Sequence, residues 1–387
     1  MGATAQALSS PWCPYALAVP VRAPVALAEL TSLHLGGPAR RLAAVSTEAD
    51  LVDAVRTADT AGEPLLVVGG GSNLVVADEG FDGTVVHVVT RGVDVRTVDG
   101  VDAGDGGAAS EADTDIARTV GPGGRGLRVD VTVAAGEPWD DLVARAVVEG
   151  WAGIEALSGI PGSTGATPIQ NVGAYGQEVA ETIVRLRAWD RRAGEVRTIR
   201  AADCGFGYRT SVFKGHDRYV VLEVTFRLPL AAAGAPIRYA ELARHLDTEP
   251  GGTAPMADVR QAVLDLRRGK GMVLDPDDHD TWSAGSFFTN PVLDPADVPA
   301  GAPMWPQPDG RVKTSAAWLI DHAGYGKGHP GPGGRVALST KHPLALTNRG
   351  GASTADLLAL AREVRDGVRS RFGVELVNEP TLVGCTL

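Results

Sequence analysis

The sequence predicts an α+β fold with mixed sheets, not a doubly wound parallel sheet. The first observation is an apolar strand, Leu65–Val68, that enters the glycine-rich turn at residues 69–73. A second apolar strand, Leu74–Val76, follows this turn, whereas a Rossmann dinucleotide motif would continue into a helix. The second observation is the alternation of apolar and polar residues over 219–228, which indicates a half-buried antiparallel strand.

The first half of the chain carries further helix and strand signals in order. Thr47 and Asp50 have the spacing of a capping box, and the apolar residues that follow share one helical face. Strands are expected over 85–89 and 127–134, and the apolar spacing of Trp139–Glu149 predicts a helix. A stretch rich in Asp, Gly and Ala, at about 93–126, has few large apolar residues and is expected to be a solvated insertion.

The second half continues with strands at 186–189 and 195–199, around a charged turn. The run AAAGAP at 231–236 is typical of a domain boundary, and a helix is expected to end near Lys270. Ser353 and Asp356 form a second capping box, which opens the last long helix, and Gly373 is placed to close it. We therefore expect a poorly ordered tail (1–25), a first domain (26–230) and a C-terminal domain (231–387).

Composition excludes several classes of protein. The 387 residues, 44% of them hydrophobic, are enough for two or three domains. A net charge of −11 argues against a nucleic-acid surface, and no stretch has the roughly 20 apolar residues of a membrane span. The three cysteines have no metal-binding spacing, which suits a reducing cytoplasm. The run Asp277-Asp278-His279-Asp280 resembles a metal cluster, but such runs on polar turns are usually solvated, so we expect no metal.

The glycine-rich segment 157–177 is the strongest functional signal. Its glycines let backbone approach a ligand closely, and its neutral side chains add hydrogen-bonding groups among free amides. Long structureless segments in compact domains are usually functional or disordered, and the interleaved apolar residues argue against disorder. Together with the earlier turn, it predicts a phosphate- and ring-binding surface. The candidate binding residues are Gly69, Gly70, Gly71, Ser72, Asn73, Gly162, Ser163, Thr164, Gly165, Gln170, Asn171, Gly173, Ala174, Tyr175 and Gly176.

Several motifs in one order resemble the UDP-N-acetylenolpyruvoylglucosamine reductase family, in the branch with a substrate-closing tyrosine. They are VVGGGSNLVV, SGIPGSTGATPIQNVGAYGQEV, YRTSVFK, SAGSFFTNP, AAWLIDHAGYGKG and NEPTLVG. The resemblance implies a two-part FAD-binding domain of the PCMH/vanillyl-alcohol-oxidase type, with a C-terminal α+β substrate-binding domain whose last strand returns to the flavin. It also implies non-covalent FAD, NADPH as co-substrate, and reduction of UDP-N-acetylglucosamine enolpyruvate to UDP-N-acetylmuramate for peptidoglycan synthesis.

The resemblance assigns a role to each of three catalytic candidates. Arg209 would bind the carboxylate that gains charge, Ser286 would donate a proton, and Glu379 would assist at the same oxyanion. Without the motifs, Ser286 would be an ordinary turn serine. Arg209 would be a surface residue paired with Asp203 or Glu178.

The resemblance also implies a set of substrate-binding residues. Tyr239 would close over the diphosphate, Lys270 would contact phosphate, and Asn290 would contact the uridine diphosphate. The other substrate-binding candidates are Tyr208, beside the catalytic arginine, and His322, which stands where the family often has glutamine. Tyr239 also suits a core position, and a cation such as Lys270 is favoured at a helix C-terminus in any protein.

Two alternatives to this function remain open at the level of the sequence. One is an FAD-dependent sugar or hydroxy-acid oxidase that uses the same glycine-rich surface, although SAGSFFTNP and NEPTLVG would then be unexplained. The other is a non-catalytic sensor of UDP-sugars, which would tolerate the loss of Ser286 or Glu379. We expect the protein to be a cytoplasmic monomer.

Overall fold

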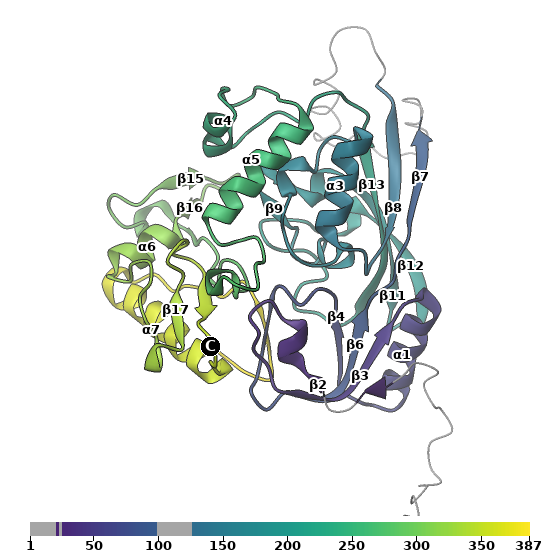
Figure 1. The fold of residues 1–387 in the computed structure, drawn as a ribbon, viewed down its shortest axis with the longest axis horizontal. Coiled ribbons are helices and arrows are strands. Elements are labelled where there is room, and N and C mark those ends of the chain that lie inside the picture. Colours follow the sequence, from purple (N-terminus) through teal and green to yellow (C-terminus); the bar gives the residue numbers. More distant parts are fainter. Residues whose placement is uncertain (1–20, 23–24, 99–125) are drawn as a thin grey trace, which may run out of the picture.

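The computed structural model describes residues 21–22, 25–98 and 126–387. Figure 1 shows two sheets in one half of the molecule and a region of helices and short strands, coloured green to yellow, in the other. Residues 1–20, 23–24 and 99–125 lie outside the described residues; they include most of the expected tail (1–25) and most of the expected insertion (93–126). None of the helices in the described ranges is long and apolar enough to span a bilayer.

The first sheet mixes parallel and antiparallel pairs, which confirms the α+β class. Its order is β1-β3-β6-β4, with β2 also on β3. The neighbours β3/β6 and β4/β6 are parallel, while β1 and β2 pair antiparallel with β3. The elements are β1 (Val21–Arg22), β2 (Val25–Ala26), η1 (Leu27–Leu30), β3 (Pro38–Val45), α1 (Glu48–Thr60), β4 (Leu65–Val68) and β6 (Phe81–Val88).

The start of the chain differs from the expected tail in one respect. Val21–Arg22 and Val25–Ala26 pair with β3, because the edge of that strand offers free backbone partners to any extended segment. The tail therefore does not reach residue 25. Helix α1 begins as predicted, with the Thr47 hydroxyl accepting from the backbone N–H of Asp50 at 3.1 Å.

The second sheet is antiparallel throughout, in the order β12-β11-β13-β8-β7. Its elements are β7 (Val93–Val98), β8 (Arg128–Ala134), β11 (Ile183–Asp190), β12 (Glu195–Arg200) and β13 (Tyr219–Pro229), and helix α3 (Trp139–Glu149) packs beside it. The alternating segment is thus the central strand β13, as predicted. One large core joins the two sheets, since Val86 of β6 and Phe226 of β13 belong to the same buried cluster.

Strand β7 corrects the expected insertion. Val93–Val98 pairs with β8 over its whole length, so the insertion does not begin at residue 93. The exposed face of this edge strand carries charged and polar residues, and that made it look like solvated loop. Backbone pairing with β8 supplies the order that side-chain burial does not.

The glycine-rich segment lies between α3 and β11 and contains only short elements. These are η2 (Glu155–Leu157), η3 (Thr164–Ala166), β9 (Gly173–Ala174), β10 (Gln177–Glu178) and η4 (Val179–Glu181). Asn171 and Tyr175 have φ angles of 47° and 49°, in the left-handed region that non-glycine residues rarely adopt. The segment is therefore an ordered, conformationally unusual loop.

The remaining residues form two packed groups. Helices α4 (Ala240–His245) and α5 (Met256–Gly269) share a small core with Ala156, and Arg260 of α5 pairs with Asp140 of α3. A second core collects around α7 (Thr354–Phe372), which has the predicted capping box and ends at Gly373 with a φ of 71°. The other elements are η5 (Ala201–Asp203), η6 (His279–Thr281), β14 (Val292–Leu293), η7 (Pro295–Asp297), β15 (Met304–Pro306), β16 (Val312–Thr314), α6 (Ala316–His322), η8 (Pro332–Gly334), β17 (Val336–Leu338) and β18 (Leu346–Asn348).

The end of the chain returns to its beginning. Strand β19 (Thr381–Val383) lies parallel to β5 (Leu74–Val76), directly after the first glycine turn. Leu33 and Val75 are buried in the same core as α7, so the C-terminal residues are packed into the N-terminal region. This pairing brings segments about 300 residues apart to one place.

Candidate active site

The two glycine-rich segments pack directly against each other. The Ser72 hydroxyl donates to the carbonyl of Pro161 at 2.9 Å. A Cβ on Gly70 would lie 2.5 Å from Gly162 Cα, and a Cβ on Gly69 would lie 2.1 Å from Ser163 Oγ. The glycines therefore permit a backbone contact that larger residues would block.

The turn after β4 uses its carbonyls in the fold and leaves its amides free. The Gly71 carbonyl accepts from Ser32 N, and the Asn73 carbonyl accepts from Thr381 N at 3.0 Å. The backbone N–H groups of residues 69–73 donate to no other residue in the described part of the chain. The Thr164 hydroxyl is likewise buried without a partner. A set of unpaired donors of this kind is a binding surface for an anion such as a phosphate.

A chain of polar contacts joins both glycine segments to the C-terminal region. Asn73 Nδ2 donates to Gln170 Oε1 at 2.9 Å, and Gln170 Nε2 donates to Glu379 Oε1 at 3.3 Å. Arg209 Nε lies 3.2 Å from the same Glu379 oxygen. The structure therefore brings two of the three catalytic candidates into contact, beside the glycine-rich surface.

Arg209 is held in a fixed and unfavourable backbone conformation. Its φ of 52° is rare for a side chain of this size. The guanidinium donates to the carbonyl of Gly173 at 2.7 Å, and Lys214 Nζ donates to the carbonyl of Arg209 at 3.0 Å. The alternative surface partners are engaged elsewhere, since Asp203 pairs with Arg200 and Glu178 accepts from Asn171.

Glu379 is an enclosed carboxyl beside two cations. Burial raises its pKa, while the positive charges of Arg209 and Lys214 act in the opposite direction. Its backbone N–H donates to the carbonyl of Phe287 at 2.8 Å, and Phe288 forms an antiparallel bridge with Asn378. This pairing places Glu379 beside Phe287, the residue that follows Ser286.

Ser286 has one side-chain contact that sequence reasoning missed. Its Oγ lies 3.3 Å from His342 Nε2. The histidine follows Lys341 in a loop between β17 and β18, and nothing in the local pattern marks it as functional. Tertiary pairing brings this loop to the serine, for example the hydrogen bond from Phe287 N to the carbonyl of Leu344 at 2.7 Å.

Two substrate-binding candidates, Lys270 and Tyr239, meet around the ring of Tyr175. Lys270 Nζ lies 5.5 Å from the ring of Tyr175 and 2.5 Å from Glu241 Oε2. The Tyr239 ring meets the Tyr175 ring edge-on at 5.5 Å and is 45% exposed, so Tyr239 is not a core residue. The Tyr239 side chain is therefore accessible from solvent.

A cleft of about 420 Å³ opens beside Lys270 and reaches His342. Lys327 and Lys341, which sequence reasoning did not single out, also line it. The cations outnumber the acidic residues Glu241 and Asp265 at this cleft. Its charge suits an anionic ligand such as a diphosphate.

Of the remaining substrate-binding candidates, Tyr208 and Asn290 lie together and His322 lies apart from them. Burial raises the pKa of the Tyr208 phenol, while hydrogen bonds from Asn290 oppose that shift, so these two residues are in contact. His322 instead stacks on Trp318 with ring centroids 3.9 Å apart, and its Nδ1 lies 2.9 Å from the Trp318 carbonyl. The structure gives His322 no contact with the other candidates among the residues it describes.

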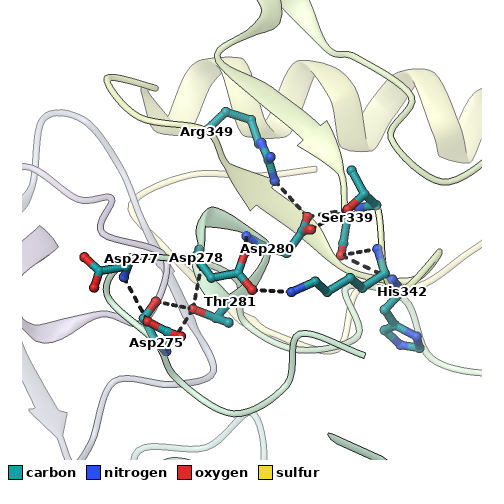
Figure 2. A network of polar contacts seen from close by, with 10 residues as sticks. Asp275, Asp277, Asp278, Asp280, Thr281, Ser339, His342 and Arg349 are labelled. Atoms are coloured by element: carbon teal, nitrogen blue, oxygen red, sulfur yellow. Dashed lines mark hydrogen bonds and ion pairs between the residues drawn. The ribbon is translucent and has the colours of Figure 1, made fainter. Parts of the chain in front are cut away.

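The acidic run at 277–280 is not simply solvated. Figure 2 shows that Asp280 points into a polar network, where its carboxylate accepts from Thr340 N at 3.0 Å and pairs with Arg349 at 2.7 Å. Asp280 is only 4% exposed. Within the described ranges, no group of three or more His, Cys, Asp or Glu side chains is arranged to hold a metal ion.

Two models of known protein families match parts of this chain. Residues 39–110 and 127–200 match the model of an FAD-binding domain. Residues 275–383 match the model of the UDP-N-acetylenolpyruvoylglucosamine reductase C-terminal domain.

Curated relatives and a solved structure agree with these matches. A reductase of the same name from Saccharopolyspora erythraea is 57% identical over 94% of this chain and 95% of its own length. Another, from Cutibacterium acnes, is 55% identical over 94% of this chain and 90% of its length. The crystal structure of the Thermus caldophilus reductase aligns with a TM-score of 0.61 at 25% identity, over 94% of this chain and 99% of that one.

Proposed function

The chain belongs to the UDP-N-acetylenolpyruvoylglucosamine reductase family, and we propose that it reduces UDP-N-acetylglucosamine enolpyruvate to UDP-N-acetylmuramate with electrons from NADPH. The observation that carries this proposal is the contact between Arg209 and Glu379, 3.2 Å apart, beside the segment of Ser286. An arginine and a carboxyl suited to an oxyanion thus lie next to a hydroxyl that is able to donate a proton.

The free amides of the first turn and the orphaned hydroxyl of Thr164 fit a bound FAD. Residues 69–73 would hold the pyrophosphate, because an unpaired row of N–H groups binds phosphate oxygens. Bound FAD would carry two electrons from the nicotinamide to the substrate double bond. Gln170, Asn171, Gly173, Ala174, Tyr175 and Gly176 would line the remaining surface of the flavin.

Gly70→Ala should weaken FAD binding through a clash between the two glycine segments. The new Cβ would lie 2.5 Å from Gly162 Cα, and backbone must move to relieve it. Overpacking of this kind costs about 1–3 kcal/mol, so we expect flavin affinity to fall by about 5- to 150-fold. Flavin absorbance after dilution and filtration measures the loss. Gly326→Ala, where an added Cβ meets no atom within 4 Å, should keep its flavin; equal retention by both variants would contradict the packing argument.

The reaction sets three tasks for side chains of this chain. As negative charge collects on the substrate carboxylate, the planar fork of Arg209 can bind both of its oxygens. Burial raises the pKa of Glu379, and in its protonated form this carboxyl would be able to donate a hydrogen bond to the same oxyanion. Ser286 donates the proton that completes the new C–H bond, a step that a hydroxyl performs only at a strongly basic, carbanion-like centre.

The basic cleft is the proposed site for the sugar nucleotide. Lys270 would contact the diphosphate and Tyr239 would cover it, while Asn290 would bind the uridine diphosphate beside Tyr208. His322 is proposed as a further contact that forms only with substrate. We place the enzyme in the cytoplasm as a monomer.

The flavin-oxidase alternative is not favoured. The reductase C-terminal domain model covers residues 275–383, which include both SAGSFFTNP and NEPTLVG. An oxidase acting on a sugar or hydroxy acid would leave these motifs without a role. The high identity to reductases over most of the chain likewise supports the reductase.

Two half-reactions test the function. The purified protein should show flavin absorbance, and NADPH should bleach it in the absence of oxygen. The enolpyruvyl substrate should then restore the absorbance, while UDP-N-acetylglucosamine, which lacks the double bond, should not. Reoxidation by oxygen with no response to the enolpyruvyl substrate would overturn the proposal in favour of the oxidase. NADH in place of NADPH measures the nucleotide preference.

A further inference from the structure

His342 touches the proposed proton donor but has no part in the reaction outlined above. Its Nε2 lies 3.3 Å from Ser286 Oγ, within hydrogen-bonding distance. A serine hydroxyl has one proton and two lone pairs, so its partner decides where the proton points. The effect of His342 on the serine therefore depends on whether Nε2 or Oγ donates the hydrogen in this contact.

The loop that carries His342 is anchored at three successive residues. The Ser339 hydroxyl accepts from the backbone N–H of Lys341 at 3.0 Å and of His342 at 3.2 Å. Asp280 accepts from Thr340 N, and Lys341 pairs with Asp278. Figure 2 shows these contacts converging on the short loop, with His342 at its edge. A backbone supported in this way fixes the point from which the imidazole ring projects before substrate arrives.

The acidic run thus supports the loop without touching the reacting atoms. Asp280 is nearly inaccessible to solvent and also pairs with Arg349 from beyond β18. The serine strand is tied to the same loop through the hydrogen bond from Phe287 N to the carbonyl of Leu344. Both partners of the Ser286–His342 contact are therefore fixed by backbone hydrogen bonds.

The charge state of the imidazole narrows its role. Burial lowers the pKa of His342 to about 4, and the positive charges of Lys270, Lys327 and Arg267 act in the same direction. At neutral pH the ring is uncharged and carries one N–H. The uncharged ring does not act as an acid. It acts on the serine through a hydrogen bond.

We propose that His342 is a positioning residue for Ser286, with its Nε2–H donating to the serine oxygen. This arrangement occupies a lone pair of Oγ and leaves the serine O–H free to point at the substrate. When the O–H bond breaks, a C–H bond forms at the substrate α carbon and the electron pair stays on Oγ. The Nε2–H then stabilises that negative charge until Oγ takes a proton from water. The inference rests on the proposed function and adds a residue to it.

Three substitutions of His342 separate this role from structural support. Leucine removes the donor, asparagine places an amide near the position of Nδ1, and glutamine places one near Nε2. We expect H342L and H342N to slow substrate-dependent flavin reoxidation by about 10- to 100-fold, the effect of losing a hydrogen bond to a charged group. H342Q should stay within about threefold of the native rate. Anaerobic stopped-flow measurements of the pre-reduced enzyme give these rates.

A double-mutant cycle shows whether the histidine acts through the serine. H342L should slow reoxidation much less in a S286A background than in the native enzyme, because its partner is already gone. The rate of flavin reduction by NADPH reports that each variant is folded and loaded. The exposed His216, changed to leucine, is the matched control and should behave as the native protein.

Each outcome decides the question. Equal losses from H342L in both backgrounds, or an H342Q variant with bound flavin that is as slow as H342L, would overturn the positioning role. If H342L fails to hold flavin, the comparison of H342Q with H342N carries the test alone. Failure of the proposed function looks different, because the native reduced enzyme would then not respond to the enolpyruvyl substrate.

Discussion

Ser286→Ala is expected to slow substrate-dependent reoxidation of the reduced flavin by about 100- to 10,000-fold, the usual contribution of a positioned proton donor. Flavin reduction by NADPH should be unchanged, since that step needs no proton from this residue. The side chain is small and its hydroxyl contacts only His342 among the described residues, so the fold should tolerate the change. Rapid mixing under anaerobic conditions measures the two half-reactions separately.

An exposed serine provides the matched control. Ser370→Ala, near the C-terminal end of α7, should leave both half-reactions at the native rate. If Ser286→Ala slowed neither half-reaction, or slowed both equally, Ser286 would not be the proton donor. Binding of substrate to the oxidised enzyme, followed by the flavin spectrum, should remain near the native affinity.

Arg209→Met is expected to slow substrate reduction by about 100- to 1,000-fold, because it removes a preorganised cation from the site where negative charge develops. The variant also leaves Glu379 enclosed without its nearest partner, 3.2 Å away in the native protein. Loss of such a partner costs about 1–3 kcal/mol of folding stability. Steady-state and single-turnover rates measure the first effect, and thermal unfolding measures the second.

The pH dependence of this variant follows from the sign of the Glu379 shift. Burial raises the pKa of Glu379, and the cation at Arg209 holds that rise down. Without the cation the pKa rises further, so the folded protein binds a proton that the unfolded chain releases. Stability of Arg209→Met should therefore fall, relative to the native protein, as the pH rises above the unfolded value of about 4.3.

Two further variants make this prediction decisive. Adding Glu379→Gln to Arg209→Met should restore stability and remove the extra pH dependence, but not the activity. Arg200→Met, at a solvent-exposed arginine paired with Asp203, should change neither property by more than about twofold or a few tenths of a kcal/mol. A native-like rate for Arg209→Met would show that the substrate carboxylate is bound elsewhere.

The sequence was most informative where structure depends on neighbouring residues. The capping box of Ser353 and Asp356, the closing Gly373 and the helix Trp139–Glu149 are set by contacts within a few residues. The strand–turn–strand around residues 69–73 could be predicted for the same reason. The motif resemblance named the family, and each proposed catalytic residue came from that resemblance.

Prediction from the sequence was wrong for two polar segments that the fold orders. Val93–Val98 has few buried side chains, yet its backbone completes a sheet with β8. Asp280 lies in an acidic run typical of solvated turns, yet Thr340 and Arg349 enclose it. In both cases the stabilising partner is distant along the chain, so local composition does not indicate it.

By itself, the sequence determined the α+β class, the helix ends, the flavin-type glycine segments and the family. Only the tertiary structure decided that β19 lies beside β5, that Arg209 meets Glu379, and that His342 faces Ser286. The physical reason is the range of the interactions. Capping and periodicity act over a few residues, whereas strand pairing and buried polar contacts select partners from any part of the folded chain.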